Sequence, residues 1–233
     1  MSNHISLESF DQDGAVRETA EAAGANRRDF LRKGAIAGGG FVAGGVLFNG
    51  FASPAEAAIS TRNKSKKNDV KILNYALTLE FLEAEFYKQA LANKVFGSDA
   101  ALGKYTAVVA DHEADHVSFL RGALGKAAIK KPSFDFGKAV TDVAMYRATA
   151  QVLEDTGVSA YAGQGPNLFQ RPVVAAALSI HSVEARHAAW IRFLNGGGAA
   201  NAKTTALPAP LTFDKPASER VVLRAVGATG FIQ

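Results

Sequence analysis

Four stretches of the chain repeat apolar residues at spacings of three and four, the pattern of one face of an α-helix. They cover residues 69–92, 98–124, 137–162 and 172–194. Asn68 or Asp69 precedes the first stretch and Ser98 the second, as N-caps would. Pro172 suits a first helical position, and the glycines after Asn195 suit a helix end. No stretch alternates convincingly like a β-strand, so the pattern predicts an all-α protein.

Helices of this length, about 36 Å each, suit a four-helix bundle, which we assign to residues 69–195. Residues 125–136 join the second and third helices. Such a segment reaches about 40 Å when extended, just enough to cross the whole bundle, so the pattern leaves the topology open. Residues 196–233 form a linker rich in Gly, Ala and Pro. A short helix near 216–226 is expected to pack back through Val221, Val222 and Leu223.

The first 57 residues have the order of an export signal: a basic region, an uncharged region rich in Gly and Ala, and an Ala-x-Ala site ending at Ala57. The basic region resembles a twin-arginine translocation signal, with the motif residues Arg27, Arg28, Phe30 and Leu31. We therefore expect cleavage after Ala57, the twin-arginine translocase as a partner, and a periplasmic or extracellular location. A membrane anchor is the alternative, but the many glycines disfavour it.

The amino-acid composition excludes several kinds of cofactor and disfavours nucleic-acid binding. The chain has no Cys, which excludes disulfides, Cys-bound zinc and Cys-bound iron–sulfur clusters. Its net charge is +4, and the segment at 58–68 is a basic linker. Such a run is usually a solvated tether that can also touch an anionic surface. Basic and aromatic residues do not interleave in the way that nucleic-acid binding favours.

Carboxylates and imidazoles interrupt the apolar stripes. Glu184 and His187 lie one helical turn apart, in line with Ile180 and Ile191. A charge on a face that points into a core is costly, so this pair calls for a chemical reason. The helix at 98–124 carries the same Glu-x-x-His pattern. Random placement of the Glu and His residues that follow Ala57 predicts well under one such pair, and two are present.

The first and third helices complete an internal two-fold repeat. Each carries one Glu on its stripe and a Tyr seven residues later: Glu80 with Tyr87, and Glu154 with Tyr161. Six side chains would then meet at the bundle centre: Glu80, Glu113, His116, Glu154, Glu184 and His187. Carboxylates and imidazoles suit iron or manganese, and four carboxylates balance two divalent ions. Without metal, the four buried carboxylates would repel one another.

Further residues on or beside these stripes are candidates to support the ligands by hydrogen bonding: Glu83, Tyr87, Tyr161, His181 and Gln151. The sequence also allows other roles for these residues. The two tyrosines also suit a core with satisfied hydroxyl groups, and His181, one turn before Glu184, also suits a ligand. Glu83 lies on a neighbouring stripe and competes with Glu80, whereas Glu85 is expected in solvent.

Several segments resemble a known family: "LTLEFLEAEFY", "ADHEADHVSFLRGAL", "LEDTGVSAY" and "SVEARHAAWIRFL". Two Glu plus two Glu-x-x-His pairs on four helices is the ligand set of ferritin-like di-iron carboxylate proteins. The sequence resembles the ferritin-like domain family that includes plant desiccation-related proteins and exported bacterial members. The resemblance covers about residues 69–194 and the C-terminal segment. The resemblance implies up-down-down-up topology, and its Glu-to-Tyr spacing favours Glu80 over Glu83 as ligand.

These observations predict a ferritin-like four-helix bundle with a short C-terminal helical extension, exported and binding two iron ions, with manganese as the alternative metal. The expected activity is oxidation of Fe(II) or scavenging of O2 or peroxide, including a catalase-like variant. No individual catalytic residue is assigned. The competing hypothesis is a non-catalytic bundle for stress or envelope protection, in which the metal site is structural or vestigial.

Overall fold

The computed structural model describes residues 59–233. Within this range the chain forms five α-helices: α4 (Lys66–Ala92), α5 (Ala100–Leu124), α6 (Val143–Gln164), α7 (Arg171–Arg192) and α8 (Glu219–Thr229). The all-α prediction is confirmed. The predicted export signal, including Arg27, Arg28, Phe30, Leu31 and Ala57, lies outside the described residues. Among the described helices, none combines the length and the apolar character needed to cross a membrane.

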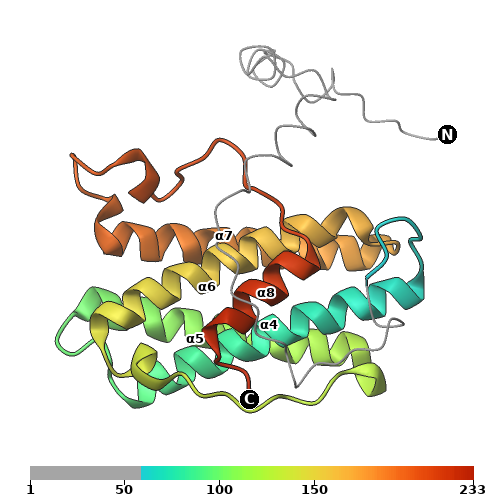
Figure 1. Cartoon of the computed structure of the whole chain (residues 1–233), viewed down its shortest axis with the longest axis horizontal. Helices are drawn as coiled ribbons and strands as arrows, with labels where there is room; N and C mark the ends of the chain where they lie inside the picture. Colours follow the sequence, from blue (N-terminus) through green and yellow to red (C-terminus); the bar gives the residue numbers. More distant parts are fainter. Residues whose placement is uncertain (1–58) are drawn as a thin grey trace. The chain divides into compact units, whose positions relative to one another are not determined.

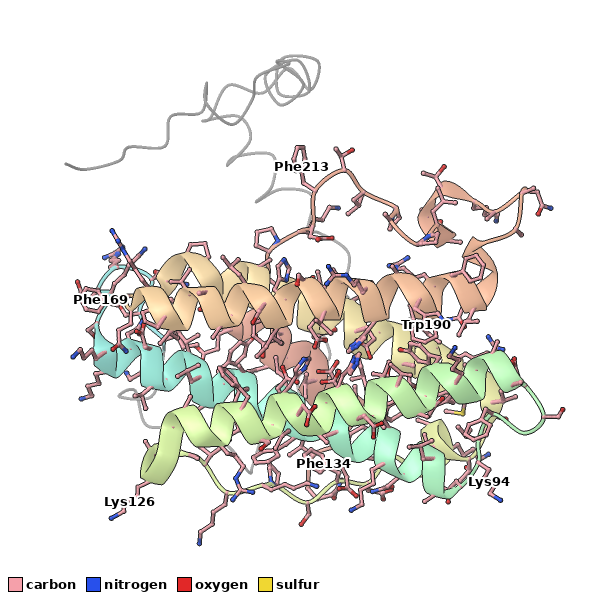
Figure 2. All side chains as sticks on the ribbon, turned by 180° about the vertical axis from the view of Figure 1, so that it is seen from behind. Lys94, Lys126, Phe134, Phe169, Trp190 and Phe213 are labelled. Carbon is pink, nitrogen blue, oxygen red and sulfur yellow. The ribbon has the colours of Figure 1, made fainter. Side chains whose placement is uncertain are left out.

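The first helix begins earlier than the pattern indicates. Ser65 caps α4 and accepts a hydrogen bond from the Asn68 backbone N–H, so the expected caps, Asn68 and Asp69, are wrong. Asp69 is fully buried, and its carboxylate accepts the backbone N–H groups of Phe169 and Gln170 at 2.8 Å and 3.0 Å. It therefore fastens the connection between α6 and α7 to the start of α4, at the end of the bundle where Figure 2 labels Phe169.

The other helix starts differ by small shifts. Asp99, not Ser98, caps α5 by accepting the Leu102 N–H. The third helix begins at Val143 rather than near residue 137, because Gly137–Val140 forms a separate 3-10 turn. Pro172 lies in the first turn of α7, as predicted. That helix ends in a π-turn, where Gly196 takes a φ of 104°, a conformation that favours glycine.

Contacts between the helices define the topology. Tyr87 and Tyr161 bond to Glu154 and Glu80, so α4 and α6 run antiparallel. His112 contacts His187 while the later His116 lies beside the earlier Glu184, so α5 and α7 are also antiparallel. With α4 and α5 forming a hairpin, the order is up-down-down-up. Residues 125–142 make the long crossover, which runs along the bundle and carries Phe134 (Figures 1 and 2).

The C-terminal helix packs on the bundle as predicted, but with a different buried face. In Figure 1, α8 lies across α4 and α6. Val222 and Val226 are buried, whereas Val221, which we expected to pack, is exposed. The segment before α8 crosses α6 closely: Ala217 N–H donates to the Ser159 carbonyl at 2.9 Å. A Cβ atom on Gly163 would lie 1.8 Å from the Ala217 carbonyl oxygen, so this crossing requires glycine.

Apolar side chains fill the bundle on both sides of a polar middle layer (Figure 2). Towards one end, the core includes Leu82, Phe86 and Tyr146. Towards the other, it includes Leu77 and Leu120. The polar layer between these clusters therefore has low-dielectric surroundings, in which an uncompensated charge is costly.

Candidate metal centre

Six buried or nearly buried side chains from four helices meet in the polar layer. Glu80 comes from α4, Glu113 and His116 from α5, Glu154 from α6, and Glu184 and His187 from α7. The four glutamates are fully buried and His187 is 2% exposed, while His116 keeps 12% of its side chain exposed. The structure thus brings together all six side chains that the sequence pattern selected.

Their ligand atoms form two overlapping groups, each of which could hold one metal ion. Glu80, Glu113, His116 and Glu184 make one group, and Glu113, Glu154, Glu184 and His187 make the other. Within each group the ligand atoms lie within 4.8 Å of one another. Because Glu113 and Glu184 belong to both groups, they are the two residues placed to bridge a pair of ions.

The imidazole nitrogens of the two histidines point at the carboxylates. His116 Nδ1 lies 3.2 Å from Glu80 Oε2, 3.2 Å from Glu184 Oε1 and 3.3 Å from Glu113 Oε2. His187 Nδ1 lies 3.1 Å from Glu113 Oε1 and 3.3 Å from Glu154 Oε2. The two oxygens of Glu113 therefore face different histidines, which is the arrangement a bridging carboxylate requires.

Several buried polar atoms of the cluster make no hydrogen bond of suitable direction in the described part of the chain, although some lie 3.1–3.3 Å from an imidazole or carboxylate atom. They are Glu113 Oε1, Glu154 Oε2, both Glu184 carboxylate oxygens and His187 Nδ1. Buried polar atoms are almost always satisfied, so each exception requires an explanation. All of them are lone-pair donors suited to iron or manganese. A pair of metal ions fits this donor set and would satisfy these atoms together.

The charges of the cluster are unbalanced without metal. Burial, together with the neighbouring carboxylates, raises the pKa of Glu83, Glu113 and Glu184 well above its ordinary value. Burial acts to raise the Glu80 pKa, but the hydrogen bonds that Glu80 makes, with His116 and Tyr161 among its partners, and the charge of His116 together outweigh burial and lower it. The carboxylates around His116 overcome the opposing effect of burial and raise its pKa to about 12. Two histidines cannot neutralise four carboxylates, so without metal the cluster favours protonated carboxyl groups.

The two tyrosines of the repeat support the carboxylates crosswise. Tyr161 on α6 donates its hydroxyl to Glu80 on α4, and Tyr87 on α4 donates to Glu154 on α6. Each tyrosine therefore orients the glutamate of the other repeat, not the one seven residues before it. Tyr105 extends the pattern, with its hydroxyl 2.7 Å from that of Tyr87 and 3.3 Å from Glu154 Oε1.

Two residues that contact the cluster, Tyr105 and His112, were not among the site residues predicted from the sequence. Tyr105 lies eight residues before Glu113 on the same stripe, so helical spacing could have identified it. Its ring packs edge-on against Trp190, whose side chain lies between α5 and α7 (Figure 2). His112 is exposed, yet its Nδ1 lies 2.9 Å from His187 Nε2, the nitrogen that faces away from the carboxylates. No local signal separates His112 from an ordinary surface histidine.

The other sequence candidates lie outside the two groups. His181 is half-buried one turn before Glu184, and its Nδ1 has no hydrogen-bond partner among the described residues. Gln151 accepts a hydrogen bond from the Asn195 side chain, so the expectation that it supports a ligand is replaced by a contact at the bundle end. Glu85 bonds to Lys131 at the surface. Glu83 is buried one turn after Glu80, beside the cluster.

Fold and cluster together define a class of protein: a four-helix bundle with a buried carboxylate and imidazole site that could hold metal ions. The model of the ferritin-like domain family matches residues 68–197, more than half of the chain. This protein therefore belongs to the ferritin-like domain family. A comparison with curated proteins finds no match.

Proposed function

We propose that this chain is an exported di-metal carboxylate protein that binds two iron ions and oxidises Fe(II) or consumes O2 or peroxide. The observation that carries the proposal is the pair of overlapping ligand groups sharing Glu113 and Glu184. Two ions held side by side by shared carboxylates can together deliver more than one electron. A single structural ion would need only one of the two groups.

The protein's own residues prepare this chemistry. Four carboxylates balance the charge of two divalent ions, and the apolar clusters on both sides exclude water. Tyr161 and Tyr87 hold Glu80 and Glu154 in place by hydrogen bonds. His112 contacts the outer nitrogen of His187 and so holds the ring with Nδ1 towards the carboxylates. Bound iron would supply the electrons for reduction of O2 or peroxide.

Carboxylate and imidazole donors suit iron, and manganese accepts the same donors. The sequence resemblance to exported bacterial members of the family, and to plant desiccation-related proteins, agrees with a protective role through removal of Fe(II) or an oxidant. All six ligand positions carry a Glu or a His, which favours a working metal site over a vestigial one.

Metal content and oxidation kinetics test the function. Protein purified without chelator should contain close to two iron or manganese ions per chain by elemental analysis. Anaerobically Fe(II)-loaded protein should then consume O2 or peroxide and develop the absorption of Fe(III), faster than free Fe(II) in the same buffer. Folded protein that refuses both Fe(II) and Mn(II) would overturn the proposal. Protein that binds two ions but reacts with neither oxidant would favour a structural role.

Export through the twin-arginine translocase is a separate part of the proposal. This route carries folded proteins, which suits loading of metal in the cytoplasm before transport. Replacing Arg27 and Arg28 together by lysine should retain the protein inside the cell, because the paired arginines identify the signal. Protein recovered outside the cytoplasm should begin at Ala58 by N-terminal sequencing. Equal export of the wild type and the double-lysine variant would contradict this route.

A further inference from the structure

A fifth buried carboxylate borders the cluster. Glu83 on α4 is 3% exposed, and its Oε1 has no hydrogen-bond partner in the described part of the chain. The groups that act on it electrostatically are other carboxylates, first Glu184 and then Glu154. Among the described residues, no Lys or Arg pairs with it. A buried carboxylate oxygen in these surroundings lacks the cation that would stabilise it.

The internal repeat shows that this carboxylate is an addition to the six-residue pattern. Glu80 corresponds to Glu154 and Tyr87 to Tyr161, so the counterpart of Glu83 is Gly157. One repeat therefore has a carboxylate where the other has no side chain. Because α4 and α6 run antiparallel, these two positions face each other across the bundle.

The space at Gly157 is filled by the carboxylates. A Cβ atom placed on Gly157 would lie 3.0 Å from Glu184 Oε2 and 3.6 Å from Glu83 Oε1. Glycine inside a helix is less stable than alanine, so its presence in α6 calls for a reason. The close approach of Glu184 Oε2 supplies that reason, and Glu83 Oε1 lies in the same space at an ordinary van der Waals distance.

The neighbours of Glu83 indicate which of the two metal positions lies nearest to it. Glu184, whose Oε2 shares the space at Gly157 with Glu83, belongs to both groups. Gly157 lies one turn after Glu154, and Tyr87, one turn after Glu83, bonds to Glu154. Glu83 therefore faces the group of Glu113, Glu154, Glu184 and His187. It is not a member of that group as placed, but rotation about its side-chain bonds can bring an oxygen to an ion.

We propose that Glu83 is a seventh ligand of the metal centre, binding the ion held by Glu154 and His187, in the space that Gly157 provides. This inference rests on the proposed two-ion site. With Glu83 bound, five carboxylates surround two ions, which leaves one excess negative charge when both are divalent. The additional anion stabilises the higher oxidation state, so it favours oxidation of that ion.

Anaerobic titration of the full chain with Co(II) tests this ligand directly, because cobalt absorption reports the coordination number. The wild type should bind two Co(II) ions. Glu83→Gln should bind one of them about tenfold or more weakly, with stronger visible absorption from the lower coordination number. Glu85→Gln, on the same helix but paired with Lys131 at the surface, should match the wild type.

A second variant guards against an effect of the amide itself. Glu83→Asp keeps the charge but withdraws the carboxylate by one methylene group, and it should show the same direction of change. Two Co(II) ions bound with unchanged affinity and spectrum in both Glu83 variants would overturn the seventh ligand and leave the two-ion site intact. A folded wild type that binds no Co(II) would overturn the two-ion site, and the role of Glu83 with it.

Discussion

Replacing Glu113 by alanine should leave the protein without either metal ion. Glu113 belongs to both ligand groups, and its two oxygens lie 3.3 Å from His116 Nδ1 and 3.1 Å from His187 Nδ1. In the proposed two-ion site, removing it would take one ligand from each ion and the carboxylate that they would share. Elemental analysis after gel filtration should therefore fall from about two ions per chain to nearly none, and oxidation of Fe(II) should fall with it.

Two comparison variants make this result specific. Glu154 belongs to only one group, so Glu154→Ala should keep about one ion per chain, held by Glu80, His116 and the shared carboxylates. Glu85 lies on α4 but bonds to Lys131, so Glu85→Ala should keep both ions. Equal loss of metal from Glu113→Ala and Glu85→Ala would contradict the assignment of helix faces. Equal loss from Glu113→Ala and Glu154→Ala would contradict two distinct metal positions.

The metal-free protein should become less stable as the pH rises from 5.5 to 8. Glu83, Glu113 and Glu184 have raised pKa values in the fold, so above their ordinary pKa the folded state binds more protons than the unfolded chain. Each such group lowers the free energy of unfolding by up to about 1.4 kcal/mol per pH unit inside its window. A decrease in Tm of roughly 10 °C between these pH values is expected.

The histidines also make the metal-free fold less stable as the pH rises, and Glu80 does not change this trend between pH 5.5 and 8. His116 and His187 have raised pKa values, so their stabilising contribution is complete below their ordinary pKa and is lost as the pH rises through the raised value. The lowered pKa of Glu80 adds stability above its ordinary value and loses it only in more acidic solution, below this pH range. The stability of the metal-free fold therefore decreases with pH throughout the range.

Bound metal should reverse the pH dependence of stability. Binding requires deprotonated carboxylates and neutral imidazole nitrogens, so ions bind more tightly at pH 8 than at pH 5.5, and the loaded protein gains stability with pH. Thermal unfolding followed by circular dichroism, with EDTA or with Mn(II), measures both slopes. Glu184→Gln should raise the Tm of the metal-free form at pH 8, because glutamine needs no proton to stay neutral in the buried cluster. Parallel pH dependences with and without metal would contradict this account of the cluster.

Helical periodicity predicted most of the fold and the composition of the polar layer. Apolar stripes define which face of each helix points inward, and Glu80, Glu154 and the two Glu-x-x-His pairs lie on those stripes. In a bundle the inward faces share one interior, so residues on them at similar heights must meet. That is why the six side chains could be selected before their distances were known.

Helix ends were predicted less well, because capping depends on competition between neighbouring polar residues. Asn68 and Asp69 have the right chemistry for an N-cap, but Ser65 takes that role. Asp69 instead bonds to backbone N–H groups about 100 residues away. Local patterns identify residues that can accept a backbone N–H but do not identify which N–H is available.

What the sequence determined by itself was the all-α class, the inward faces and the donor set of the centre. Only the tertiary structure decided which residues pair across the bundle: Tyr87 with Glu154, Tyr161 with Glu80, and the surface His112 with His187. It also placed Glu83 opposite Gly157. The physical reason is that periodicity fixes the direction of a side chain around its own helix, whereas the axial offset between packed helices fixes the partner it meets.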